Sequence, residues 1–174
     1  MIEEENLIQP GMGPGSTYSD SDHKTSRRRW WRYGPPIVWA ILIFIGSGDL
    51  LSGSHTGGFL LKPLRWLFPQ ASEATLAGIH FWIRKAGHVT EYAILASLTA
   101  RAFRSSSVES LRRGWFWAAL TVAVVYSLSD EFHQSFVPSR GASLHDSMID
   151  SIGGLLGVTI VWWWYRRSQR KIRR

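Results

Sequence analysis

The chain has 174 residues, of which 13% are aromatic and ten are tryptophan, and its formal net charge is +7. It has no cysteine, which excludes disulfides, thiolate metal sites and thiol nucleophiles. A positive charge invites a nucleic-acid interpretation, but here the basic residues gather at the ends of apolar runs, and no base-stacking or phosphate-binding motif accompanies them. Because positive charge at such ends orients membrane segments, we predict a membrane protein with no nucleic-acid partner.

The first part of the chain combines a polar tail with an apolar segment. Residues 1–29 are rich in Glu, Gly, Pro, Ser and Asp, a composition that predicts a disordered cytoplasmic tail. A first helix is expected over about 34–51, with Pro35 and Pro36 in its first turn, where backbone N–H groups lack partners anyway. Residues 53–72 follow as a loop with a short amphipathic piece, which suits a membrane interface.

Three further helices are predicted in the rest of the chain. The second spans about 74–103, and the third spans 115–136, where Pro138 ends it. The fourth begins near Ser143 and runs to Tyr165. Residues 166–174 then form a basic cytoplasmic tail.

The apolar segments predict an all-α fold, a polytopic four-helix membrane bundle over residues 30–165. Runs such as "VWAILIFI" and "IVWWWY" are apolar on all faces, and a small soluble domain rarely buries four such segments. Their charge-free stretches are shorter than the roughly 20 residues that cross a bilayer, so the charged turns must lie at or within the membrane. Most of the 20 lysines and arginines fall on the side of the termini, which predicts that both termini are cytoplasmic.

Charged residues interrupt the second helix on one face. Lys85, His88 and Tyr92 are spaced i, i+3 and i+7, so they project from the same side of the helix. Glu91 lies partly off this face. In the predicted topology the face belongs to the outer half of the bilayer.

The third and fourth helices carry matching polar faces. Asp130 and Gln134 are spaced i and i+4, and Glu131 is turned about 100° away from them. Asp146 and Asp150 have the same spacing, and Gly153 and Gly157 continue their stripe along the fourth helix. Because a Gly-x-x-x-Gly face allows another helix to approach closely, these carboxylates are expected to point into the bundle.

Ionisable groups at membrane depth cost about 2.5 to 3.5 kcal/mol, so they are usually paired and lie in polar cavities. We therefore predict a polar pocket that faces the outside. In it, Lys85 and Arg140 would hold an anionic head group, and Asp130, Glu131 or His88 are candidate catalytic acids and bases. The alternative is structural: the charges only neutralise one another and hold the helices together.

A metal site is not predicted, and neither is a cofactor. Four histidines lie near acidic residues, namely His80, His88, His133 and His145. No two of them have the i, i+4 spacing of a helical zinc site.

Two blocks, "KAGHVTEYAIL" and "SDEFHQSFVPSRGASLHDSMIDSIGGLLG", resemble the VanZ-like membrane proteins. In that family a Lys-x-x-His-x-x-x-Tyr element opens one helix, and an Asp-Glu-x-x-Gln element with a following Arg and a downstream Asp joins the next two. The matching positions are Lys85, His88, Tyr92, Asp130, Glu131, Gln134, Arg140 and Asp146. Family members usually carry Asn one turn later, whereas this chain has Asp150.

The resemblance implies a multi-pass protein of the bacterial cytoplasmic membrane. The family takes its name from a protein linked to glycopeptide (teicoplanin) resistance, which points to the cell envelope without naming a reaction. The expected partners are membrane lipids and a lipid-linked envelope glycan, with a homodimer as a candidate assembly. Three interpretations stay open beside the structural one: a binding role, a transferase or hydrolase acting on a lipid-linked phosphate, and a small proton-coupled transporter.

Overall fold

A computed structural model describes residues 17–48, 53–138 and 143–172 of the chain. These residues form helices and no strand, which confirms the all-α class for the described part of the chain. In chain order the helices are α1 (Thr17–Ser47), α2 (Gly53–Leu67), α3 (Glu73–Arg104), α4 (Glu109–Arg113), α5 (Trp115–Gln134) and α6 (Leu144–Ile172).

Helix α1 begins much earlier than the expected start at Gly34. It starts at Thr17, so it covers part of the segment that was predicted to be disordered, whereas residues 1–16 lie outside the described residues. Pro35 and Pro36 are therefore inside the helix and not in its first turn. Each proline lacks the N–H that would bond to the carbonyl four residues earlier, so α1 loses two hydrogen bonds at this point.

The other helices are close to the predicted segments, with three differences. The amphipathic piece forms a complete helix, α2, and the connection between α3 and α5 contains the short helix α4. Helix α6 continues to Ile172, so most of the expected basic tail is helical. Ser72 begins α3, because its hydroxyl oxygen accepts the backbone N–H of Thr75 at 3.2 Å.

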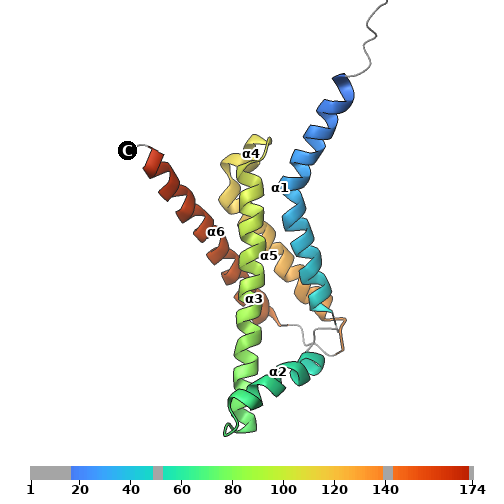
Figure 1. Ribbon diagram of the computed structural model, residues 1–174, viewed down its shortest axis with the longest axis vertical. Helices are drawn as coiled ribbons and strands as arrows, with labels where there is room; N and C mark the ends of the chain where they lie inside the picture. Colours follow the sequence, from blue (N-terminus) through green and yellow to red (C-terminus); the bar gives the residue numbers. More distant parts are fainter. Residues whose placement is uncertain (1–16, 49–52, 139–142, 173–174) are drawn as a thin grey trace, which may run out of the picture.

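Helix α3 is the centre of the molecule, because it contacts all five other helices (Figure 1). Its most extensive interface is with α6, and α5 packs against both. Helix α1 packs on α3 and α5, where Trp39 Nε1 donates to the carbonyl of Glu91 at 2.9 Å and the Tyr126 hydroxyl donates to the carbonyl of Ala40 at 2.6 Å. The start of α1 and the end of α6 lie at the same end of the molecule as α4, opposite α2 (Figure 1).

Glycines determine how closely α3 and α6 approach. A Cβ atom added at Gly157 would lie 2.1 Å from the carbonyl oxygen of Ala93, and one at Gly153 would lie 2.4 Å from that of Val89. Gly154 faces α5, where an added Cβ would lie 2.9 Å from the Cβ of Ala123. The predicted role of the Gly153 and Gly157 face in close helix packing is confirmed.

The buried apolar core is small and is built mainly from alanine. Its members between α3, α5 and α6 are Ala96, Ala100, Ala119, Ala123 and Val158. A second cluster joins α1 to α3 through Ile43, Tyr92 and Leu95. Small side chains let the helix backbones come close, so packing between them depends on close contact and not on large apolar side chains.

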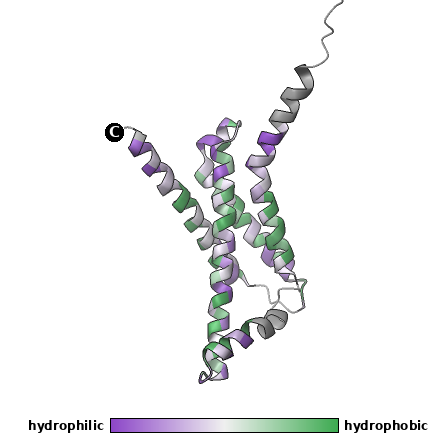
Figure 2. Cartoon of the chain, viewed as in Figure 1, coloured by the Kyte–Doolittle hydropathy of each residue, from purple (hydrophilic) through white to green (hydrophobic). Residues whose placement is uncertain are grey.

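The large apolar side chains point outward instead. Exposed positions occur on every long helix, for example Ile41 and Leu42 on α1, Trp82 on α3, Val125 and Leu128 on α5, and Ile152, Leu156 and Ile160 on α6. Figure 2 shows hydrophobic residues along the second half of α1 and in the middle of α6. Among the described helices, only α6 is both long and apolar enough to cross a membrane by length and composition alone.

Candidate functional site

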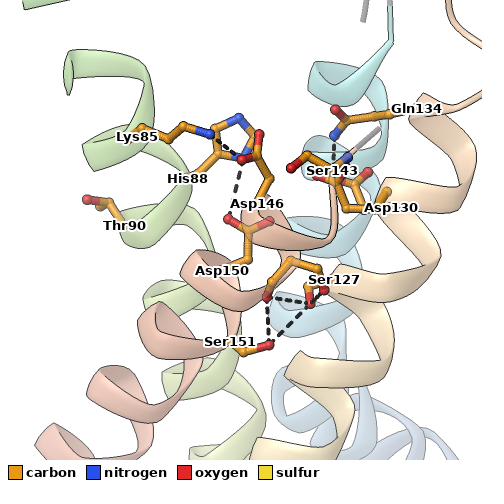
Figure 3. A network of polar contacts seen from close by, with 12 residues as sticks. Lys85, His88, Thr90, Ser127, Asp130, Gln134, Ser143, Asp146, Asp150 and Ser151 are labelled. Atoms are coloured by element: carbon orange, nitrogen blue, oxygen red, sulfur yellow. Dashed lines mark hydrogen bonds and ion pairs between the residues drawn. The ribbon is translucent and has the colours of Figure 1, made fainter. Parts of the chain in front are cut away.

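Polar side chains from three helices meet where α3, α5 and α6 pack together (Figure 3). We define the polar cluster as Lys85, His88, Tyr92, Asp130, Glu131, Gln134, Asp146 and Asp150. These are all but one of the residues expected to line a pocket. The remaining one, Arg140, lies outside the described residues.

An ion pair and a contact between an imidazole and a carboxylate connect α3 to α6. Lys85 Nζ donates to Asp146 Oδ1, and both side chains keep a little exposure to solvent. About one turn further along, His88 Nδ1 lies 3.5 Å from Oδ1 of Asp150, whose side chain is completely buried. Lys85 and His88 lie about one turn apart on one face of α3, and Asp146 and Asp150 lie about one turn apart on one face of α6. Because these two faces pack against each other, each residue of α3 meets one carboxylate of α6.

Helix α5 contributes two carboxylates with different partners. Asp130 Oδ2 accepts a hydrogen bond from Gln134 Nε2 at 2.9 Å, along the same face of the helix. Glu131 points to another side, where its Oε2 accepts the backbone N–H of Ser143 at 2.7 Å, just before α6 begins. One oxygen of Glu131 therefore stabilises the start of α6. The sequence predicted Glu131 as a catalytic acid or base and did not indicate this structural role.

Three serines extend the network deeper between α5 and α6. The hydroxyls of Ser127 and Ser147 are 2.8 Å apart, and the Ser151 hydroxyl donates to the carbonyl of Ser147 at 2.7 Å. These serines were not among the residues predicted to line the pocket. Their spacing could have indicated that they lie near the polar cluster, because Ser147 and Ser151 each follow a cluster aspartate by one residue. Ser127 precedes Asp130 by three residues.

Tyr92 lies at the bottom of the cluster, between the acids and the apolar core. Its side chain is completely buried and packs with Ile43 and Leu95. Its hydroxyl lies near the carboxylates of Asp130 on α5 and Asp150 on α6. Tyr92 therefore closes the cluster on the side of α1.

The polar cluster has more hydrogen-bond acceptors than donors. Asp130 Oδ1 and Glu131 Oε1 are buried and accept no hydrogen bond within the described residues. Both oxygens of Asp150 are buried as well and accept no hydrogen bond there, although His88 Nδ1 lies 3.5 Å from Oδ1 and the Tyr92 hydroxyl is near. Because a buried polar atom without a partner costs about 1 to 3 kcal/mol, this arrangement favours a ligand or a proton that supplies donors.

A metal ion is one way to satisfy carboxylate oxygens. Within the described residues, however, no three acid or imidazole side chains are close enough together to hold one metal ion. The acids are instead distributed over separate pairs: Asp146 with Lys85, Asp150 with His88, and Asp130 with Gln134.

The comparisons with known proteins support the resemblance noted in the sequence. Residues 35–165 match the family model described as VanZ/LLP1, and this range contains the whole polar cluster. A search of curated proteins and a search of solved structures each found no match. Proteins of this family are generally membrane-associated. Because the match covers well over half of the chain, the protein belongs to the VanZ/LLP1 family.

Proposed function

We propose that this VanZ-like envelope protein crosses the cytoplasmic membrane with α1, α3, α5 and α6. The distribution of side chains supports this topology, since large apolar residues cover the outside of these helices and four carboxylates point inward. In a protein dissolved in water the reverse arrangement is the rule. Basic residues gather at the end of the molecule where α1 begins and α6 ends, which supports cytoplasmic termini and a polar cluster in the outer half of the membrane.

Single cysteines test this topology, because the native chain has none. Gln70→Cys, in the turn between α2 and α3, is expected to react with a membrane-impermeant maleimide in intact cells. Ser107→Cys, near α4, is expected to react only after the cells are permeabilised. Both native side chains are exposed, whereas the neighbouring Ser106 is buried and unsuitable. Labelling of Ser107→Cys alone in intact cells would show the opposite orientation.

We further propose that the polar cluster binds the head group of a lipid-linked envelope glycan. The observation that carries this proposal is the set of buried carboxylate oxygens on Asp130, Glu131 and Asp150 that accept no hydrogen bond within the described residues. Sugar hydroxyl groups are donors of the required kind, and carboxylates accept such bonds strongly.

The phosphate of the carrier needs a cation, and the described part of the cluster offers Lys85. Because Lys85 is already paired with Asp146, the phosphate must share this lysine with the carboxylate. Arg140, which follows α5 by a few residues, is the proposed second cation. A ligand with hydroxyl donors on one side and a phosphate on the other therefore suits the cluster better than a simple anion.

Asp130→Asn is expected to weaken this binding without unfolding the protein, because the amide has the size of the carboxylate but accepts hydroxyl donors less strongly. The probe is a polyprenyl-diphosphate disaccharide, and its affinity for the purified protein is measured in detergent by native mass spectrometry. We expect about a tenfold loss, the effect of one charge-assisted hydrogen bond. Bare polyprenyl phosphate, which lacks the hydroxyls, should bind equally to both forms.

Glu73→Gln is the matched control, since this exposed acid at the start of α3 pairs with Arg65 and lies outside the polar cluster. It should bind the glycan probe as tightly as the wild type. The proposal is wrong if the wild-type protein binds the glycan probe no better than bare polyprenyl phosphate. A raised teicoplanin resistance in cells that express the protein, lost in Asp130→Asn, would connect this binding to the phenotype for which the family is named.

An enzyme is the second candidate, and the contact between His88 and Asp150 favours it. A carboxylate near Nδ1 orients an imidazole for proton exchange with a substrate. Asp130 or Glu131 would accept the proton of the water or alcohol that attacks the lipid-linked phosphate, and His88 would donate a proton to the oxygen that leaves. In the binding experiment, cleavage of the glycan probe by the wild-type protein but not by His88→Gln would identify a transferase or hydrolase.

A further inference from the structure

A groove lies between α3 and α6 at the end of the molecule opposite the polar cluster. The two helices diverge there, as Figure 1 shows, and a cavity of about 540 Å³ lies between them. Leu98, Ile160 and Val161 form its apolar part, and Arg101 and Arg104 belong to its polar part together with Ser168. The groove is thus apolar along the helices and basic near their ends.

Arg104 is held in position by aromatic rings. Its guanidinium carbon lies 3.9 Å from the centroid of the Tyr165 ring and 5.7 Å from that of Trp115. Such contacts cover the faces of a guanidinium group and leave its N–H groups, which point along the edges, available for hydrogen bonds. No carboxylate pairs with Arg104 among the described residues. The group is therefore ordered before any anion binds.

Arg101 adds a second cation at the same place and joins the groove to a neighbouring cavity. That cavity also measures about 540 Å³ and is lined by Arg27, Arg28 and Arg32 of α1. No acidic side chain is among the described residues that line either cavity. The nearest described acid in the sequence, Glu109, is paired with Arg113 at 2.5 Å. This end of the molecule therefore attracts anions.

We propose that the groove between α3 and α6 binds an anionic phospholipid of the surrounding leaflet. The phosphate contacts Arg101 and Arg104, and an acyl chain lies along Leu98, Ile160 and Val161. An apolar surface next to two arginines is complementary to an amphiphile with an anionic head group, whereas a soluble anion would not use the apolar part. The proposal relies on the membrane topology given above, but it is independent of the ligand of the polar cluster.

Arg104→Gln is expected to reduce the binding of anionic lipid roughly fivefold, the contribution of one basic residue near a charged leaflet. The protein is reconstituted in nanodiscs that contain phosphatidylglycerol and phosphatidylcholine, and the lipids that remain bound are counted by native mass spectrometry. Arg101→Gln should have a similar effect and, because Arg101 is exposed, does not disturb packing. Arg112→Gln is the matched control, since this exposed arginine on α4 lines neither cavity.

Ile160→Trp tests the apolar part of the groove without a change of charge. The exposed isoleucine lies in the groove, so the larger ring should displace the acyl chain and lower retention of phosphatidylglycerol. The proposal is overturned if Arg101→Gln retains as much phosphatidylglycerol as Arg112→Gln. It is also overturned if inorganic phosphate displaces the bound lipid, because the site would then recognise a soluble anion.

These results are independent of the earlier proposals. The polar-cluster variants change the binding of the glycan probe, whereas the groove variants change the retention of phosphatidylglycerol. The cysteine experiment decides which leaflet supplies the lipid. A failure at one site therefore leaves the result at the other intact.

Discussion

Gly157→Ala should destabilise the protein by about 2 kcal/mol or more, which is large for the addition of one methyl group. The added Cβ would lie 2.1 Å from the carbonyl oxygen of Ala93 and 2.8 Å from its carbonyl carbon. Both neighbours are backbone atoms of α3, so no side-chain rotation relieves the clash. The two helices must separate, and the contacts of Lys85 with Asp146 and of His88 with Asp150 are then stretched.

Thermal unfolding in detergent, followed by circular dichroism, measures this effect. Gly78→Ala is the matched control on α3, where an added Cβ meets no atom within 4 Å. It is expected to be neutral or stabilising by up to about 1 kcal/mol, because alanine restricts the unfolded chain more than glycine does. Equal stability of Gly157→Ala and Gly78→Ala would mean that α3 and α6 do not pack as described.

The second large effect is expected at the ion pair between Lys85 and Asp146. Replacing either partner alone, by Lys85→Met or Asp146→Asn, should cost about 2 to 3 kcal/mol, since the other is left partly buried without its partner. The double variant should be more stable than the sum of the two losses predicts. Chemical denaturation of all four forms gives the coupling energy between the two side chains. Strictly additive losses would show that the pair contributes no mutual stabilisation.

The double variant also separates the structural interpretation of the polar cluster from the functional one. A folded double variant that still binds the glycan probe would show that the pair only holds α3 to α6. A folded double variant that has lost this binding would assign the pair to the ligand site. The stability of the double variant is measured before its binding, so that unfolding is not mistaken for lost binding.

Much of the site could be predicted from local spacing. The period of the helix places Lys85 with His88, Asp130 with Gln134, and Asp146 with Asp150, and the structure has these residues on facing sides. The close approach at Gly153 and Gly157 also follows from spacing, because only small residues leave room for a neighbouring backbone. The start of α1 was predicted less well, since the polar composition before Gly34 favoured disorder over helix.

By itself, the sequence determined the all-α class, the helical faces that carry charge and the membership of the VanZ/LLP1 family. Only the tertiary structure decided the pairing: Lys85 with Asp146, His88 with Asp150, and Glu131 with the backbone of Ser143. The physical reason is that helical periodicity defines the direction of a side chain on its own helix. It does not define the relative height and rotation of two helices, which depend on how their surfaces pack, and here the glycines of α6 against α3 determine both.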